Sequence, residues 1–159
     1  MTVIKIGQPA ASAWQHLADD EQPGGGPFTV SLTRWLESGK TLSASGLHVG
    51  VRLAAADDPE ALANDLATLS LIVLDMAAFT DGRPFSQARL LRDRYGYTGE
   101  LRARGDFLRD QMFFLSRVGV DVFEFPEGTD LQDRLKAFDE FSVTYQAASD
   151  TPEPLYRRR

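Results

Sequence analysis

The stretch "SLIVLDMAAFTDGRPFSQARLLRDRYGYTGELRARGDFLRDQMFFLSRVGVDVFEF", residues 70–125, decides the fold. It opens on a run, 70–76, that is apolar except for Ser70 and Asp75 and includes β-branched residues, as expected of a strand covered on both faces. Helix patterns at 84–96 and 104–119 then alternate with strand patterns at 98–103 and 120–125. This alternation predicts right-handed βαβ units around a mainly parallel sheet.

The same rhythm extends in both directions from this stretch. Strand patterns occupy 28–32 and 47–55, helix patterns 33–40 and 57–69, and a final helix pattern runs over 128–148. We therefore predict an α/β fold with an open, doubly wound sheet as the first choice. A half-barrel is the alternative, because a full barrel needs about 200 residues or more.

The length of 159 residues fits one domain with a core of its own, which we expect over residues 1–150. Residues 1–27 are expected to be irregular, apart from a short strand pattern at 2–6, and contain a glycine–proline turn signal. Residues 151–159 are polar and proline-rich, which predicts a solvated tail.

The charge is unevenly distributed along the chain. The formal net charge is -6, yet residues 79–111 hold seven of the fourteen arginines and carry a local charge of +2. An acidic protein is a poor candidate for non-specific nucleic-acid binding, which requires many phosphates to be neutralised. A local site for one small anion remains compatible with this distribution.

The residue types that are missing exclude further classes of chemistry. The chain has no cysteine, which excludes disulfides, thiolate-held clusters and cysteine nucleophiles. It opens without a secretory signal pattern and has no apolar run long enough to cross a membrane. We therefore expect a cytoplasmic protein that does not bind membranes.

The first half of the predicted anion site follows the most apolar strand. Ligands favour the carboxyl ends of parallel strands, and residues 75–86 lie there. Arg83 precedes the next helix, Ser86 lies in its first turn, and Arg89 is the later arginine best placed to turn toward the site. Free N–H groups at a helix start, with a guanidinium nearby, suit an oxyanion or a phosphate. The alternative is that Asp81 turns the chain and Arg83 is solvated.

The second half is the stretch "GELRARGD", residues 99–106. Alternation places Glu100, Arg102 and Arg104 on one face of a strand, where they bind a ligand or form a structural ion pair. Asp106 follows as a helix N-cap. If the protein is an enzyme, Asp81, Glu100 and Asp106 are the candidate acid–base residues. Asp106 and Asp110 share a helix face and form a carboxylate cluster with Glu100, but no histidine lies near it to support a transition-metal site, so we expect no metal.

The core of the chain resembles the bacterial domain of unknown function family 934. The resemblance is carried by short motifs between residues 81 and 123, namely Asp81-Gly82-Arg83, Ser86, Ala88, Leu91-Arg92, Gly96-Tyr97, Gly99 to Ala103, Gly105-Asp106, Asp110-Gln111 and Arg117, Gly119, Asp121, Phe123. Two positions depart from the family pattern: Pro84 replaces a usual glycine, and Val118-Gly119-Val120 stands where Cys-Gly-Phe is common. Any redox chemistry of that cysteine is excluded in this chain.

The resemblance implies a role in assimilatory sulfate and sulfite reduction, since such proteins are encoded beside sulfite reductase. It suggests an accessory protein that binds a small oxyanion or a nucleotide phosphate. The alternatives are a module that binds sulfite reductase or a related sulfur-assimilation enzyme, and an oxidoreductase-associated enzyme with Asp/Glu acid–base chemistry. No motif in the chain identifies a cofactor.

Overall fold

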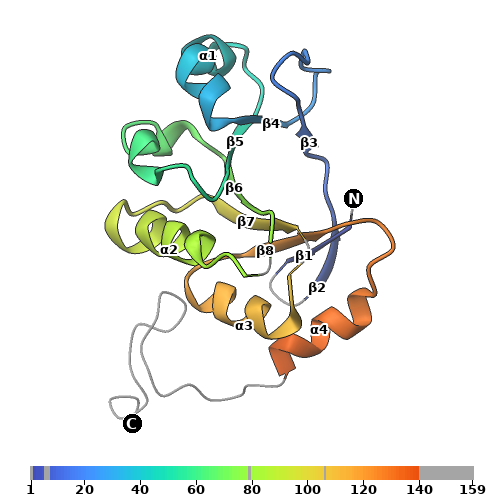
Figure 1. Cartoon of the computed structure of the whole chain (residues 1–159). Helices are drawn as coiled ribbons and strands as arrows, with labels where there is room; N and C mark the ends of the chain where they lie inside the picture. The colour runs from blue at the N-terminus through green and yellow to red at the C-terminus, as the bar shows by residue number, and fades with distance from the viewer. Residues whose placement is uncertain (1, 6–7, 79, 106, 140–159) are drawn as a thin grey trace.

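The computed structural model describes residues 2–5, 8–78, 80–105 and 107–139, which fold around one curved sheet (Figure 1). The sheet has eight strands in the order β2-β1-β8-β7-β6-β5-β4-β3. The strands are β1 (Thr2–Lys5), β2 (Gln8–Ala11), β3 (Gln15–His16), β4 (Phe28–Ser31), β5 (Val49–Leu53), β6 (Leu71–Met76), β7 (Glu100–Gly105) and β8 (Val122–Phe125). Strands β3 to β8 are mutually parallel, whereas β1 pairs antiparallel with both β8 and β2.

The order of the parallel strands decides between the two predicted arrangements. From β3 to β8 each strand lies beside the next one in the chain, and the order never reverses. A doubly wound sheet requires a reversal, because right-handed connections cross to the other face only when the chain turns back. The α/β fold is therefore confirmed, and its sheet is the half-barrel rather than the doubly wound alternative.

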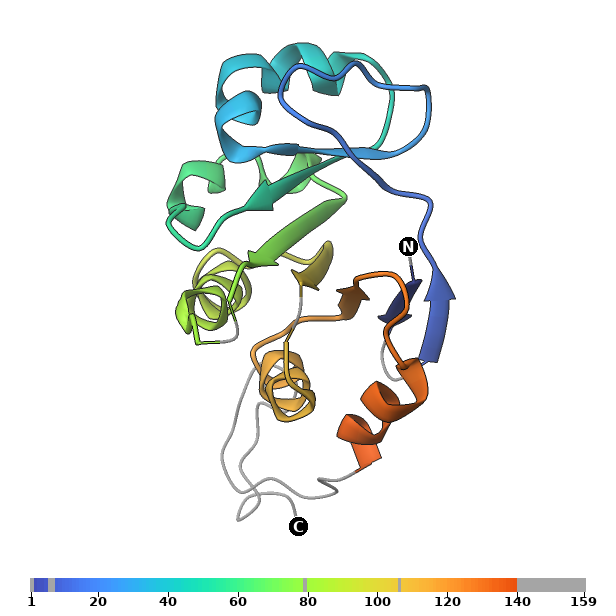
Figure 2. The same cartoon turned by 45° about the vertical axis from the view of Figure 1, so that its right-hand side comes forward.

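Helices cover one side of this half-barrel. They are α1 (Leu32–Ala44), α2 (Arg83–Arg89), α3 (Arg109–Arg117) and α4 (Leu131–Asp139), with short helical turns η1 (Pro59–Leu62), η2 (Leu66–Thr68) and η3 (Leu90–Arg94). Figure 2 shows α1, α2 and α3 along one side, while the blue chain from β2 to β3 runs along the other. The half-barrel thus has a helix-covered outer face and an inner face crossed by the N-terminal segment.

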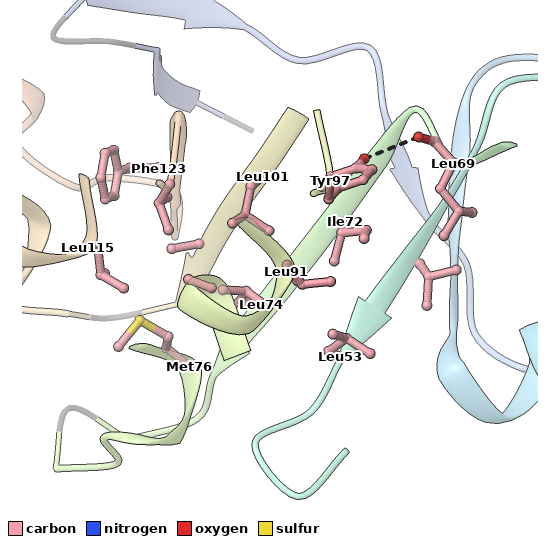
Figure 3. Close-up of a cluster of buried hydrophobic side chains, with 14 of the residues drawn as sticks. Leu53, Leu69, Ile72, Leu74, Met76, Leu91, Tyr97, Leu101, Leu115 and Phe123 are labelled. Atoms are coloured by element: carbon pink, nitrogen blue, oxygen red, sulfur yellow. Dashed lines mark hydrogen bonds between the residues drawn. The ribbon is translucent and has the colours of Figure 1, made fainter. Parts of the chain in front are cut away.

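The outer face holds the hydrophobic core (Figure 3). Strand alternation turns Ile72, Leu74 and Met76 of β6 toward the helices, where they are at most 3% exposed. Leu91 and Leu115 meet them from η3 and α3. Burying an aliphatic side chain of this size contributes about 1.5–3 kcal/mol, so this layer drives the packing of helices on the sheet.

The N-terminal segment is more ordered than its sequence suggests. The strand predicted at 2–6 is present as β1, and its Val3 and Ile4 are buried beside β8. Two more short strands, β2 and β3, occur where irregular structure was expected. Each is stabilised mainly by its pairing with a neighbouring strand, which a local pattern does not reveal.

Helix boundaries also differ from the predictions. The pattern at 57–69 forms the short turns η1 and η2 instead of one α-helix, because side chains bind backbone groups: Asp58 accepts from the N–H of Glu60, and the Thr68 hydroxyl donates to the Asp65 carbonyl. The pattern at 104–119 becomes a helix only at Arg109. The last helix is present to Asp139, and the predicted remainder to 148 lies outside the described residues, as do Asp106 and the tail.

Within the described part of the chain, no helix combines the length and the apolar character needed to span a membrane.

Candidate functional site

The inner face of the half-barrel carries charged side chains. The same alternation that points Leu74 of β6 outward points Asp75 inward, and its cross-strand partner Arg104 lies beside it on β7. Arg104 in turn pairs in register with Glu124 on β8, so the three side chains form a row across three strands. Ionisable side chains reach this inner face from strands β3, β5, β6, β7 and β8, namely His16, Arg52, Asp75, Arg102, Arg104 and Glu124.

Arg102 is the buried anchor of this network, with 3% of its side chain exposed. One terminal nitrogen donates to Glu124 Oε2 at 2.6 Å and to Ser12 Oγ at 2.8 Å. The other donates to Glu100 Oε1 at 2.7 Å. Such short charge-assisted bonds fix a guanidinium in place. Arg102 therefore ties the N-terminal segment to β7 and β8.

Glu124 is held on both of its oxygens. His16 Nε2 lies 2.7 Å from Oε1, and the second ring nitrogen lies 2.7 Å from Thr29 Oγ1. Burial alone would raise the pKa of Glu124, but the bonds from His16 and Arg102 lower it below its ordinary value. The carboxylate thus remains charged and fully engaged.

Asp75 and Arg104 are held far less tightly. Arg104 lies 3.3 Å from Asp75 Oδ1 and 3.6 Å from Glu124 Oε1, and 38% of its side chain is exposed. Arg52 approaches the other oxygen of Asp75 only to 4.0 Å, because its terminal nitrogens donate to Thr29 and to the Leu17 carbonyl. Burial raises the pKa of Asp75 despite the two arginines, and burial lowers the pKa of Arg52.

A cleft opens beside this loosely held pair. It has a volume of about 650 Å³ and lies at the carboxyl ends of β6, β7 and β8. Its lining includes Asp75, Arg104 and Glu124, with Gly105 and Phe125 completing the strand ends. This is the edge at which parallel α/β sheets bind their ligands.

The residues predicted from the loop after β6 lie elsewhere. Arg83 pairs with Asp81 at 2.7 Å, its side chain is 63% exposed, and the pair lies at the start of α2. Hydrogen bonds from the Arg83 side chain and backbone hold the pKa of Asp81 at about 2. Ser86 is exposed on α2, and Arg89 pairs with Asp93 at 3.4 Å. None of these four lines the cleft.

The residues predicted on β7 do share the inner face, as alternation required. Glu100 binds Arg102, the structural ion pair that was one of the sequence alternatives, and also Lys5 at 3.2 Å. Arg104 reaches the cleft, but Arg102 lies beneath the network. Arg83 and Arg102 share no partner among the described residues, so the two predicted halves do not form one pocket.

Sequence reasoning missed four members of the network. Arg52, Asp75 and Glu124 are each a single charge inside an otherwise apolar strand pattern, and this signal could have identified them. His16 had no such signal, because its partner Glu124 is 108 positions away in the chain. Across the described ranges, no three His, Cys, Asp or Glu side chains are grouped so that they could hold a metal ion.

Comparison with known proteins places this site within a family. No curated protein matches the chain. The sequence profile described as "Bacterial protein of unknown function (DUF934)" matches residues 50–156, a range that includes the cleft residues and leaves out His16 and Thr29. This match spans more than half of the chain and agrees with the resemblance seen in the sequence motifs. The protein therefore belongs to the DUF934 family of bacterial proteins.

Proposed function

We propose that the protein binds a small anion in the cleft at the carboxyl ends of β6, β7 and β8, with Arg104 as its main contact. The observation that supports this is the looseness of Arg104. Its contacts of 3.3 and 3.6 Å lie beyond the usual range of charge-assisted hydrogen bonds, whereas those of Arg102 are 2.6–2.8 Å. A ligand can recruit Arg104 without breaking a tight pair.

The charged groups around the cleft balance one another. Arg52, Arg102 and Arg104 face the carboxylates of Asp75 and Glu124, and the carboxylate of Glu127 also lines the cleft, so these six charges sum to zero. Farther along the inner face, Lys5 balances Glu100. Recognition of an anion therefore depends on the directed hydrogen bonds of Arg104, which are stronger in a site partly shielded from water than on an open surface.

The test compares two single substitutions that remove the same charge. Calorimetry is performed with sulfite, sulfate, phosphate and adenosine monophosphate on the native protein, on Arg104→Gln and on Arg83→Gln. We expect Arg104→Gln to weaken anion binding at least about tenfold, the loss of one charge-assisted contact. Arg83→Gln should bind as the native protein does, because it lies outside the cleft.

The reverse result would assign the ligand to the loop after β6, where the sequence motif placed it. If both variants bind the anions as tightly as the native protein does, neither arginine recognises the ligand. Failure of every anion to bind the native protein would refute the proposal.

An enzymatic role is the second candidate, and Asp75 is the residue that favours it. A carboxyl whose pKa is raised by burial, in a cleft beside an arginine, suits general acid–base chemistry. The sulfite reduction implied by the family motifs supplies the reaction to assay, with sulfite reductase as the expected partner. If the role is accessory, adding the native protein should change the turnover of sulfite reductase, and adding Asp75→Asn should change it equally. If the role is catalytic, Asp75→Asn should have no such effect.

A further inference from the structure

The floor of the cleft presents a hydrogen-bond donor and an acceptor side by side. Arg104 and Asp75 are cross-strand partners in the register of β6 and β7, and both line the cleft. Their side chains are 38% and 34% exposed, so both are accessible to a ligand. Arg104 can only donate hydrogen bonds, and the ionised Asp75 can only accept them.

The neighbouring Glu124 and Arg52 already use their side-chain atoms in hydrogen bonds within the protein. Glu124, on β8, already accepts from His16 and Arg102 at 2.6–2.7 Å. Arg52, on β5, uses its terminal nitrogens on Thr29 and the Leu17 carbonyl. Glu127 lies at the mouth of the cleft, beyond the strand ends. Asp75 and Arg104 are therefore the pair with which a small ligand at the floor can form new bonds.

We propose that this pair makes the cleft selective for an oxyanion that carries an acidic O–H group, such as hydrogen phosphate or bisulfite, over a bare oxyanion such as sulfate. This inference rests on the anion site proposed above. Arg104 donates to an anionic oxygen of the ligand, and the ligand O–H donates to Asp75. A bare oxyanion instead places an oxygen against the Asp75 carboxylate, with like-charge repulsion and no hydrogen bond between them.

The selectivity depends on the protonation of Asp75. The protonated carboxyl has an O–H of its own and can donate to a bare oxyanion, so sulfate is admitted as the pH falls. Burial raises the pKa of Asp75, which moves this change toward neutral pH. Arg104 and Arg52 face the carboxyl directly and oppose this rise in its pKa, and His16 opposes it from β3. Glu124, on β8, lies on the other side of Arg104.

The decisive experiment compares inorganic phosphate with sulfate, two tetrahedral anions of similar size. At a mildly alkaline pH both are dianions, but only phosphate keeps an O–H group. Calorimetry on the native protein should show phosphate binding about tenfold or more tighter than sulfate, the effect of one hydrogen bond exchanged for one repulsion. In Asp75→Asn the ratio should fall toward one, because the amide can donate to either anion.

Two further measurements complete the design. The affinity of the native protein for sulfate should increase as the pH is lowered, and that of Asp75→Asn should not. Sulfite and adenosine monophosphate are measured at a mildly acidic pH, because only there do bisulfite and the nucleotide monoanion keep an acidic O–H. Comparison of their affinities separates bisulfite from a nucleotide phosphate as the source of the O–H.

Each outcome decides a different question. If sulfate and phosphate bind the native protein equally and Arg104→Gln weakens both, the anion site stands and its selectivity for an O–H group is wrong. A ratio that is unchanged in Asp75→Asn, or a sulfate affinity independent of pH, also overturns the selectivity. If neither anion binds the native protein, the anion site and the selectivity both fall.

Discussion

Two carboxylates of the inner face show how environment divides the roles of chemically similar residues. Glu124 and Asp75 flank Arg104 in one cross-strand row, yet their pKa values move in opposite directions. Glu124 accepts two bonds of 2.6–2.7 Å, whereas the closest partner of Asp75 is 3.3 Å away. Glu124 therefore stabilises the fold, and Asp75 is kept available at some cost to stability.

This contrast predicts opposite effects on the pH dependence of stability. As the pH rises above 3.8, the ordinary pKa of Asp, the unfolded chain loses the Asp75 proton before the native protein does, so native stability falls. As the pH falls below 4.5, the ordinary pKa of Glu, the unfolded chain binds the Glu124 proton first, so stability falls in the other direction. The free energy of unfolding in urea should be measured between about pH 3 and pH 7. Asp75→Asn should remove the loss of stability at rising pH, and Glu124→Gln should remove the loss at falling pH. If the slope of the unfolding free energy against pH changes in the same direction in both variants, this assignment is wrong.

At the scale of single residues, local sequence patterns predicted the face of the strand to which a side chain points, but not the residue with which it pairs. Alternation placed Glu100, Arg102 and Arg104 on one face, and the structure confirms it. The sequence groups Arg83 with Arg102 because the two lie in neighbouring βα units, near the same rim of the sheet. Three hydrogen bonds between the Arg83 guanidinium and the nearby Asp81 carboxylate satisfy that guanidinium locally, and sequence spacing does not reveal such a competing partner.

At the scale of elements, Arg92 joins three segments that the sequence showed only as separate patterns. It extends from η3 and donates to the carbonyls of Tyr97, Gly99 and Gly119 at 2.6–3.0 Å. It also pairs with Asp121 at 2.5 Å, and Asp121 accepts the backbone N–H of Leu101 on β7. One side chain thus fixes the end of η3 against the starts of β7 and β8.

Arg92→Ala should therefore destabilise the protein by about 2–4 kcal/mol, because it leaves several half-buried carbonyls and a carboxylate without their donor. Arg92→Lys should recover little of this, since a single ammonium cannot reach all of these acceptors. The control is Arg89→Ala on the same helical segment, whose pair with Asp93 is exposed and should contribute less than about 0.5 kcal/mol. Equal midpoints of urea unfolding for the two alanine variants would show that the Arg92 contacts contribute no more to stability than an exposed ion pair.

Elements were predictable where hydrophobic periodicity was strong. The buried run at 70–76 and the strand at 120–125 correspond closely to β6 and β8. The pattern at 57–69 was misleading because Leu62, Leu66 and Leu69 are buried at helical spacing while the backbone makes only short turns. Periodicity reports which residues are buried, and it does not determine how the polar residues between them bond.

At the scale of the whole molecule, the half-barrel leaves an inner face that its N-terminal segment covers. The chain from β2 to β3 runs along that side (Figure 1), and Ser12 and His16 contact Arg102 and Glu124 from it. The strand order could be narrowed to two arrangements from the sequence. The covering segment could not be predicted, because its contacts join residues about 90 to 108 positions apart and depend on the sheet being curved.

This covering segment gives the last prediction, which uses the only two histidines of the chain. His16→Gln cannot bridge Thr29 and Glu124 as the ring does, so it should destabilise the protein by about 2–3 kcal/mol. His48→Gln is the matched control, since His48 is exposed and its ring lies a long 3.3 Å from Ser70 Oγ. This substitution should change stability by less than about 0.5 kcal/mol. Hydrogen exchange followed by mass spectrometry should show His16→Gln losing protection in both 12–17 and 122–125, because the lost contact joins β3 to β8 across the inner face. Loss of protection confined to 12–17 would show that the segment lies on the half-barrel without supporting it, and the cleft residue Glu124 would then owe its position to Arg102 alone.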